Sequence, residues 1–283
     1  MFYLITEWIM KVFGKVIGIL LASSSGLLFA GDHDYQGSET LRQVFELAVE
    51  EAGADGEIHY LGGGSSKGEQ ALVNGEQLLA PMSRPIKEAA LEEAAANGIE
   101  IGEIVVALDA VSIYTKSSNR LRKLSIENLR DIFTCEKTKW SDFGGAPTTI
   151  NAYVRDEASG TTETFMKLVG IDDFGRCVRE VENGRDIAQK TSSDINAIGY
   201  SGSDAKTTNN RALSISRKSG QLAYAPTLAM IRSFDYPLTR ELYIYWASEG
   251  YEPHDHEIDL LEILNDRSKS DAIVEEAGFV TLD

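Results

Sequence analysis

The residues best suited to chemistry in this sequence lie between Arg155 and Phe165. Arg155 precedes the hydroxyl-rich turn Ser159-Gly160-Thr161, and apolar residues at helical spacing follow the turn. The first N–H groups of a helix lack internal acceptors and carry partial positive charge, so they attract anions. An arginine beside them adds a two-pronged donor for carboxylate, phosphate or sulfate. The pattern predicts either an oxyanion cradle or a plain helix cap in which Arg155 pairs with Glu157.

Two more helix entrances carry hydroxyl groups. The first, Gly37-Ser38-Glu39-Thr40, precedes an amphipathic pattern over residues 41–52. The second, Gly62-Gly63-Gly64-Ser65-Ser66, follows an apolar run, and Ser66 and Glu69 have the spacing of a capping box. These glycines form either a further anion cradle or only a turn. A polar loop, Pro81-Met82-Ser83-Arg84-Pro85, follows another apolar run.

Strands and helices alternate along the chain, which predicts an α/β fold. In such folds ligands collect at the carboxyl ends of strands, where these entrances lie. We expect strands at 58–61, 77–80, 104–115, 150–154, 197–200 and 236–246, and helices at 41–52, 66–73, 87–97, 125–133, 160–169, 255–264 and 271–277.

The chain has 283 residues, enough for one large or two medium domains, and a net charge of −17. Residues 16–30 are uncharged and follow Lys11 and Lys15, the layout of a secretory signal peptide over residues 1–30. A transmembrane anchor is the competing interpretation, but the run is shorter than the roughly 20 residues that span a bilayer. So acidic a protein argues against nucleic acid or an anionic membrane as partner.

Cysteines and histidines give little support for a metal site. Cys135 and Cys177 lack CxxC spacing, and in an exported protein they either form a disulfide or stay free. His254-Asp255-His256 lies in a charged loop. We expect no metal and no cofactor.

The separated motifs together resemble one family, the periplasmic phosphate-binding proteins of ABC transporters, within the type II periplasmic binding-protein superfamily. The resemblance covers about residues 37–246. It rests on Gly64-Ser65-Ser66, on the helix at Leu124–Phe133 followed by Trp140, on Arg155 with Ser159-Gly160-Thr161, and on Tyr236-Pro237-Leu238-Thr239-Arg240. The resemblance implies two α/β lobes, each a mixed sheet flanked by helices, joined by two hinge-crossing strands. We expect lobe I at residues 31–110 plus 225–283 and lobe II at 111–224.

The resemblance also implies a set of ligand contacts in the cleft between the lobes. Glu157 matches an acidic position that orients the arginine. Arg84 is either a second positive charge near the site or a surface residue. The implied phosphate contacts are Thr40, the Leu41 N–H, Ser65, Ser83, Arg155, Ser159, Gly160 and Thr161.

Ser83 departs from the family pattern, which has an aspartate that accepts the phosphate's proton at this position. An ionised carboxylate only accepts hydrogen bonds, whereas serine both donates and accepts. Selectivity for phosphate over sulfate or arsenate is therefore open.

The resemblance implies a monomeric, periplasmic solute-binding protein that delivers inorganic phosphate to ABC permease subunits and performs no catalysis. Two alternatives remain. One is an oxyanion sensor that signals by lobe closure. The other is a serine-dependent transferase using Ser159 or Ser65, although neither serine lies in a GxSxG motif.

Overall fold

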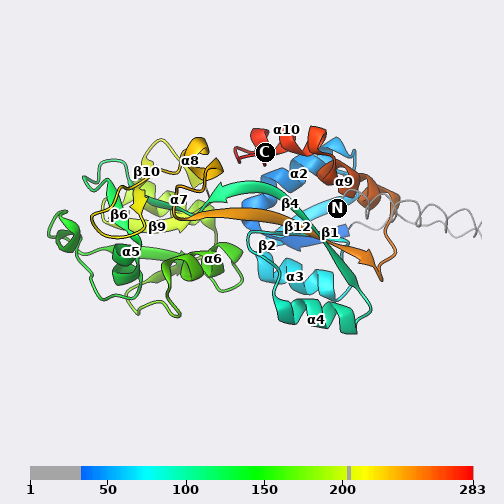
Figure 1. The fold of residues 1–283 in the computed structure, drawn as a ribbon, viewed down its shortest axis with the longest axis horizontal. Coiled ribbons are helices and arrows are strands. Elements are labelled where there is room, and N and C mark those ends of the chain that lie inside the picture. The colour runs from blue at the N-terminus through cyan, green and yellow to red at the C-terminus, as the bar shows by residue number, and fades with distance from the viewer. Residues whose placement is uncertain (1–32, 203–204, 283) are drawn as a thin grey trace, which may run out of the picture.

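The computed structural model describes residues 33–202 and 205–282. Two lobes lie side by side and are joined by two long strands that run from one to the other (Figure 1). The signal peptide expected at residues 1–30 lies outside the described residues. Among the described helices, none combines the length and the apolar character that spanning a bilayer requires.

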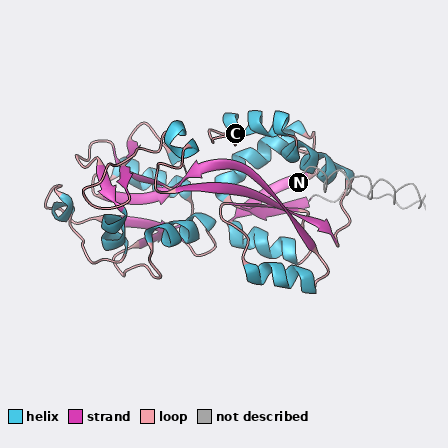
Figure 2. Ribbon diagram, in the orientation of Figure 1, coloured by secondary structure: helices cyan, strands magenta, loops and turns pink. Residues whose placement is uncertain are grey.

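Lobe I is built on two small sheets. Strands β1 and β2 pair in parallel, and β3 pairs antiparallel with the crossing strand β12. Helices α2, α9 and α10 cover one side of these strands, and α3 and α4 cover the other (Figures 1 and 2). The elements are β1 (His33–Gly37), the 3-10 turn η1 (Glu39–Leu41), α2 (Arg42–Glu51), β2 (Ile58–Gly63), α3 (Ser65–Val73), β3 (Leu79–Met82), α4 (Glu88–Ala96), α9 (Asp255–Asn265) and α10 (Arg267–Glu276).

Lobe II is built on a five-stranded mixed sheet with the order β10-β5-β9-β7-β8. Strand β7 leads into α6, and α7 leads into β9, which pairs in parallel with β7. A small parallel pair, β6 and β11, lies beside it. The elements are β5 (Ser112–Lys116), β6 (Lys123–Ser125), α5 (Ile126–Phe133), η2 (Trp140–Phe143), β7 (Asn151–Arg155), α6 (Gly160–Val169), β8 (Arg179–Val181), α7 (Gly184–Ser193), β9 (Ala197–Ser201), β10 (Asn210–Ala212), β11 (Ser214–Ser216) and α8 (Leu228–Arg232).

The crossing strands are β4 (Glu100–Ala110) and β12 (Thr239–Glu249), which pair antiparallel along most of their length. The strand expected at 104–115 is therefore two strands. The break falls at Val111, whose N–H donates to the Leu238 carbonyl, after which the chain leaves β12 and pairs with β9. A change of pairing partner leaves no mark in an uninterrupted apolar run, so the sequence pattern could not show it.

The apolar core divides in two where these strands cross. Ala107 and Leu242 belong to the core of lobe I, whereas Leu108 and Leu238 belong to the core of lobe II. Ile231 of α8 also packs in the second core. The predicted boundary at residue 225 thus differs from the division of the cores, and we propose that lobe II extends to residue 238.

Two further sequence questions have structural answers. Cys135 and Cys177 form a disulfide with Cα atoms 6.0 Å apart. The capping box expected at Ser66 and Glu69 is wrong, because Gly64 is the N-cap of α3 and provides no side-chain cap. Glu69 is instead held by Arg84, as described below.

Candidate functional site

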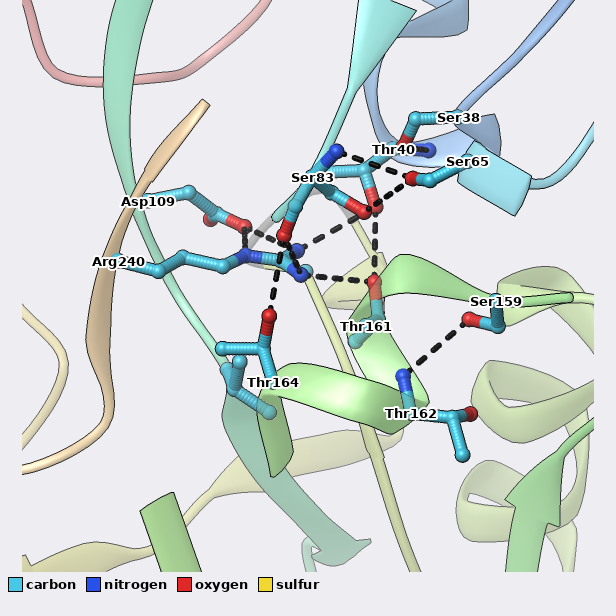
Figure 3. A network of polar contacts seen from close by, with 12 residues as sticks. Ser38, Thr40, Ser65, Ser83, Asp109, Ser159, Thr161, Thr162, Thr164 and Arg240 are labelled. Atoms are coloured by element: carbon cyan, nitrogen blue, oxygen red, sulfur yellow. Dashed lines mark hydrogen bonds and ion pairs between the residues drawn. The ribbon is translucent and has the colours of Figure 1, made fainter. Parts of the chain in front are cut away.

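Helix entrances from both lobes meet where the lobes touch. Thr40 Oγ1 of η1 lies 3.2 Å from Thr161 Oγ1 of α6 (Figure 3). The Ser66 N–H of α3 donates across the same boundary to the Ala158 carbonyl at 3.2 Å. The approach is so close that a Cβ built on Gly160 would lie 2.3 Å from Ser65 Oγ. The structure thus brings these entrances together at the contact between the lobes, and that they form one binding site stays a prediction.

The serines of lobe I form a small network behind this contact. Ser65 Oγ accepts from the Ser83 N–H at 3.1 Å and lies 3.2 Å from Ser83 Oγ. Thr164 of α6 donates from its hydroxyl to the Ser83 carbonyl at 3.2 Å. Both serines are buried. Because Ser83 contacts Ser65 of lobe I and Thr164 of lobe II, the 81–85 loop is held by both lobes.

The α6 entrance is positioned by its own cap and by aromatic packing. Ser159 Oγ accepts from the Thr162 N–H at 3.4 Å, and Tyr200 donates to Thr162 Oγ1 at 3.0 Å. The Tyr200 ring stacks on Phe165 with centroids 4.0 Å apart. Burial raises the pKa of Tyr200, so its hydroxyl stays neutral and available as a donor. The N–H groups of Gly160 and Thr161, the first two of α6, have no intrahelical acceptor and remain available to a ligand.

Arg155 ends β7 and lies on the wall of a cavity between the lobes. The cavity has a volume of about 1130 Å³, and residues of both lobes line it, Thr40 among them. The Arg155 side chain is buried, yet its guanidinium has no hydrogen bond or ion pair within the described residues, and its Nε is fully enclosed. Burial lowers the pKa of Arg155. Because arginine stays charged in proteins, this group requires an anionic partner.

The resemblance implied that Glu157 lies beside Arg155, but the structure places other carboxylates there. Glu157 is exposed, and the structure shows no ion pair between it and Arg155. The acidic groups that act on Arg155 are Asp156 and Glu39. Glu39 is itself occupied: burial alone would raise its pKa, but hydrogen bonds from Arg42 and the Gly63 N–H hold the pKa below its ordinary value. The role predicted for Glu157 is therefore not what the geometry shows.

Arg240 is the site residue that sequence reasoning did not single out. It lies on β12 opposite Asp109 of β4, and its Nη2 donates to Asp109 Oδ2 at 2.7 Å. It also donates to Thr161 Oγ1 at 2.8 Å and to Thr40 Oγ1 at 3.3 Å (Figure 3). A guanidinium only donates, so both threonine oxygens accept from it. At most one of their hydroxyl protons serves the contact between them, and at least one is left to donate to an anion.

One feature of the sequence could have indicated the Asp109–Arg240 pair: a charged residue inside an apolar strand. Asp109 interrupts the apolar run at 104–115, and Arg240 ends the motif that starts at Tyr236. A buried carboxylate needs a partner. The sequence could not show that the two positions face each other, because that depends on the register of two strands about 130 residues apart.

Arg84 is neither a surface residue nor a free positive charge in the site. It is buried and donates to Glu69 at 2.6 and 3.0 Å. It also forms an ion pair with Glu163 of α6, which Lys87 contacts at 2.5 Å. Two carboxylates thus balance its charge, and Glu163 links it to lobe II.

The remaining predicted contact, the Leu41 N–H, is engaged within η1. It donates to the Ser38 carbonyl at 3.1 Å, and the Thr40 N–H donates to Ser38 Oγ at 3.2 Å. Of the predicted contacts, only Thr40 and Arg155 line the cavity, while the others lie behind it at the contact between the lobes.

The histidines lie apart from this network. His33, His254 and His256 gather with ring centroids 4.5–5.6 Å apart, and His256 pairs with Glu57 at 2.7 Å. Within residues 33–202 and 205–282, no group of histidine, cysteine or acidic side chains has the arrangement of a metal site.

Comparisons with known proteins agree with this architecture. The chain is 26% identical to the phosphate-binding protein PstS of Pseudomonas aeruginosa, over 89% of this chain and 84% of that protein. It is 25% identical to the phosphate-binding protein PstS of Staphylococcus epidermidis, over 91% and 81% respectively.

Solved structures share the fold. A putative phosphate ABC transporter substrate-binding protein from Clostridium perfringens, with bound phosphate, matches with a TM-score of 0.77 and 19% identity, over 89% of this chain and all of that one. An ABC-type phosphate transport receptor from Vibrio cholerae matches with a TM-score of 0.70 and 20% identity, over 88% and 100%. The predicted two-lobed type II binding-protein fold is thereby confirmed. The model of the PBP superfamily domain matches residues 34–262, and the chain belongs to that superfamily.

Proposed function

We propose that this protein captures inorganic phosphate between its two lobes and delivers it to an ABC-type permease. Relatives and structural neighbours that carry phosphate-binding names support this assignment. Membership of a solute-binding superfamily is consistent with transport rather than catalysis. With the expected signal peptide removed, the protein would act as a monomer in the periplasm.

The observation that carries the proposal is the buried guanidinium of Arg155, which has no partner within the described residues. Thr40 lines the same cavity as Arg155, and the contact between Thr40 and Thr161 leaves at least one of their two hydroxyl protons to donate. The first N–H groups of α6, which follows Arg155 in the chain, have no intrahelical acceptor. An unpaired buried charge is costly, and an oxyanion supplies the missing partner with several acceptor oxygens. Lobe closure would exclude water and strengthen these hydrogen bonds.

The alternatives have less support. Among the described residues, the hydroxyls of Ser65 and Ser159 contact Ser83 and the Thr162 N–H, and neither contacts an imidazole that could activate it. An oxyanion sensor would use the same site and differ only in its partner. The finding that separates transport from sensing is whether permease and ATPase subunits bind the closed form.

Isothermal titration calorimetry with phosphate, on protein stripped of bound anion, tests the proposal. We expect saturable binding that Arg155→Ala weakens on the order of a hundredfold or more, because two charge-assisted hydrogen bonds are lost. Arg176→Ala, which removes an exposed arginine of the same lobe, is the matched control and should leave binding unchanged. Absence of phosphate binding by the unaltered protein, or equal effects of the two variants, would contradict the proposal.

A further inference from the structure

The charge of the chain is divided unequally between the two lobes. Residues 111–238, which form lobe II, contain 18 Lys and Arg against 15 Asp and Glu, a net charge of +3. The rest of the chain contains 9 against 29, a net charge of −20, and the two parts together give the −17 of the whole chain. The acidic character that argued against an anionic surface as partner therefore belongs to lobe I, and lobe II has to be judged by itself.

Within lobe II, basic residues gather in two segments that contain no acid. Residues 116–126 and 211–234 together hold eight Lys and Arg and no Asp or Glu. The two segments are joined, because β6 pairs in parallel with β11 and the Ser214 N–H donates to the Arg122 carbonyl at 3.0 Å. We call the surface that these two segments form the basic edge of lobe II.

The charges of the basic edge are not neutralised by ion pairs. Arg120, Lys123 and Lys218 are exposed, and none of them has an ion pair within the described residues. Two carboxylates border the segments, Glu127 and Asp235, and both accept hydrogen bonds from neighbouring serines. With these two counted against the eight basic residues, the basic edge keeps a net charge of +6.

Exposed apolar side chains lie among these charges. Leu222 is 72% exposed, Leu228 62% and Phe234 47%, which makes three of the six large apolar side chains exposed among the described residues. Leu222 belongs to the hairpin at 215–224, which a bridge between its two end residues closes. Arg217 of the same hairpin donates to the Phe234 carbonyl at 3.0 Å. Basic and apolar groups are therefore neighbours on one surface.

The tip of this hairpin extends into solvent. Ser219, Gly220 and Gln221 are exposed, and a Cβ built on Gly220 would meet no atom within 4 Å. Protein partners are held chiefly by anchors that fill well-packed pockets. An exposed tip with Lys, Arg and Leu side chains instead suits a membrane surface, where basic groups contact anionic headgroups and Leu or Phe enters the interface.

We propose that the basic edge of lobe II binds the surface of an anionic lipid bilayer, with its Lys and Arg side chains at the headgroups and Leu222 and Phe234 in the interface. At physiological salt, charges act over only about 8–10 Å, so the acidic lobe I opposes this contact little when lobe II faces the bilayer. The bilayer thus orients the protein. The basic edge lies outside the cavity, and the inference does not rest on the proposed function.

Co-sedimentation with lipid vesicles tests the inference, using protein from which residues 1–30, the expected signal peptide, have been removed. Vesicles of phosphatidylcholine with phosphatidylglycerol provide the anionic surface, and vesicles of phosphatidylcholine alone provide the neutral one. The unaltered protein should bind the anionic vesicles and not the neutral ones. Binding should be lost at about 1 M salt, where charges are screened within about 3 Å.

The main variant replaces Arg120, Lys123 and Lys218 by glutamine. These side chains are exposed and form no hydrogen bond within the described residues, so the fold should be kept. Each basic side chain near an anionic surface contributes about fivefold in affinity, so the loss of three should weaken vesicle binding on the order of a hundredfold.

Matched controls make the same changes elsewhere. Replacing Lys167, Arg176 and Lys269 by glutamine removes three exposed basic side chains outside the basic edge and should leave vesicle binding unchanged. Leu222→Ser should weaken binding about threefold to tenfold, because transfer of a leucine side chain out of water is favourable. Leu91→Ser, which removes an exposed leucine of α4 in lobe I, should have no effect.

The outcomes separate the basic edge from general electrostatics. Equal binding to neutral and anionic vesicles, or equal losses in the two glutamine variants, would overturn the inference. Absence of binding to either kind of vesicle would also overturn it and would leave the basic edge to an acidic protein surface. Calorimetry should show unchanged phosphate affinity in both glutamine variants, so a loss of vesicle binding confined to the first would be due to its lost charges.

Failure of the proposed function would give a different result. In that case the unaltered protein would bind no phosphate in the calorimeter, whereas its binding to anionic vesicles would remain.

Discussion

Arg155 and Arg84 are both buried arginines close to a helix entrance, yet their surroundings are opposite. Arg84 is surrounded by carboxylates, with Glu69 from its own lobe and Glu163 from the other. Arg155 has neither an ion pair nor a hydrogen bond for its guanidinium within the described residues, and it faces a cavity. Burial and neighbouring hydroxyls are thus common to the ion-paired Arg84 and to Arg155, which we propose binds the anion. The presence or absence of a fixed anionic partner distinguishes them.

The helix entrances near the two arginines, α6 near Arg155 and α3 near Arg84, also differ in whether their N–H groups already have partners. The α6 entrance is capped by Ser159, which leaves the N–H groups of Gly160 and Thr161 for a ligand. The α3 entrance begins at Gly64, with φ of 107° and no side-chain cap, and its Ser66 N–H is already bonded to the Ala158 carbonyl. A Cβ at Gly64 would lie 2.4 Å from that carbonyl. Both entrances contact the opposite lobe, but only the α6 entrance keeps first-turn N–H groups without an acceptor and follows the unpaired Arg155.

The largest expected difference between the two arginines is in folding stability without ligand. Arg84→Ala should lower the free energy of unfolding by about 3–5 kcal/mol, because it leaves the buried carboxylate of Glu69 unpaired. Arg155→Ala should leave it unchanged or raise it, because it removes a buried charge that has no partner. Urea denaturation of anion-free protein measures both values.

Arg84→Lys provides the matched control for this pair of variants. Lysine keeps the charge beside Glu69 but cannot form the two-pronged contact, so its loss of stability should be intermediate. Equal destabilisation by Arg84→Ala and Arg155→Ala would show that Arg155 has a structural partner, and the contrast between the two sites would be lost.

The sequence predicted the helix entrance that follows Arg155, but it did not predict the charged groups that act on Arg155 or on Arg84. Local patterns were sufficient for the α6 entrance, because Ser159, Gly160 and Thr161 are consecutive and precede a helical pattern. Ser83 and Ser65 were also predicted to share a site, and they lie within hydrogen-bond distance. The start of a helix is determined by residues close together in the sequence, so a short pattern is enough to predict it.

The contacts that the sequence did not predict join residues far apart in the chain. Arg240 meets Asp109 only because β4 and β12 pair in one particular register. Arg84 meets Glu163 only when the lobes come together. Glu157 was predicted to orient Arg155, but the turn exposes it and directs Asp156 to the cavity. Charge and spacing alone could not decide which of two adjacent acids faces inward.

A smaller effect, on phosphate affinity, is expected from adding a methyl group where the α6 and α3 entrances touch. Gly160→Ala adds a Cβ that would lie 2.3 Å from Ser65 Oγ and 2.8 Å from Ser83 Oγ, so it holds the lobes apart. Overpacking of this kind costs about 1–3 kcal/mol, which is at least about fivefold in phosphate affinity. Because the clash arises only on closure, the stability of anion-free protein in its open form should change less than the affinity does.

Gly56→Ala is the control for this variant, since a Cβ there meets no atom within 4 Å. Calorimetry should show unchanged phosphate affinity for Gly56→Ala and reduced affinity for Gly160→Ala. Unreduced affinity in Gly160→Ala would mean that the ligand-bound form does not bring these entrances as close together as the structure does.

The smallest expected effect concerns the ion pair that links Arg84 to lobe II. Glu163→Gln keeps the side-chain shape but removes the charge that contacts Arg84 and Lys87 across the lobes. Glu163 is 31% exposed, so we expect phosphate affinity to fall by no more than about fivefold, within the range of up to about 1 kcal/mol for such pairs. Stopped-flow measurement should place the change in the dissociation rate, because the pair forms only after closure. Asp131→Asn, which breaks a similar pair with Lys137 away from the contact between the lobes, should leave that rate unchanged. A faster dissociation of equal size in both variants would show that Glu163 acts through net charge and does not hold the lobes closed.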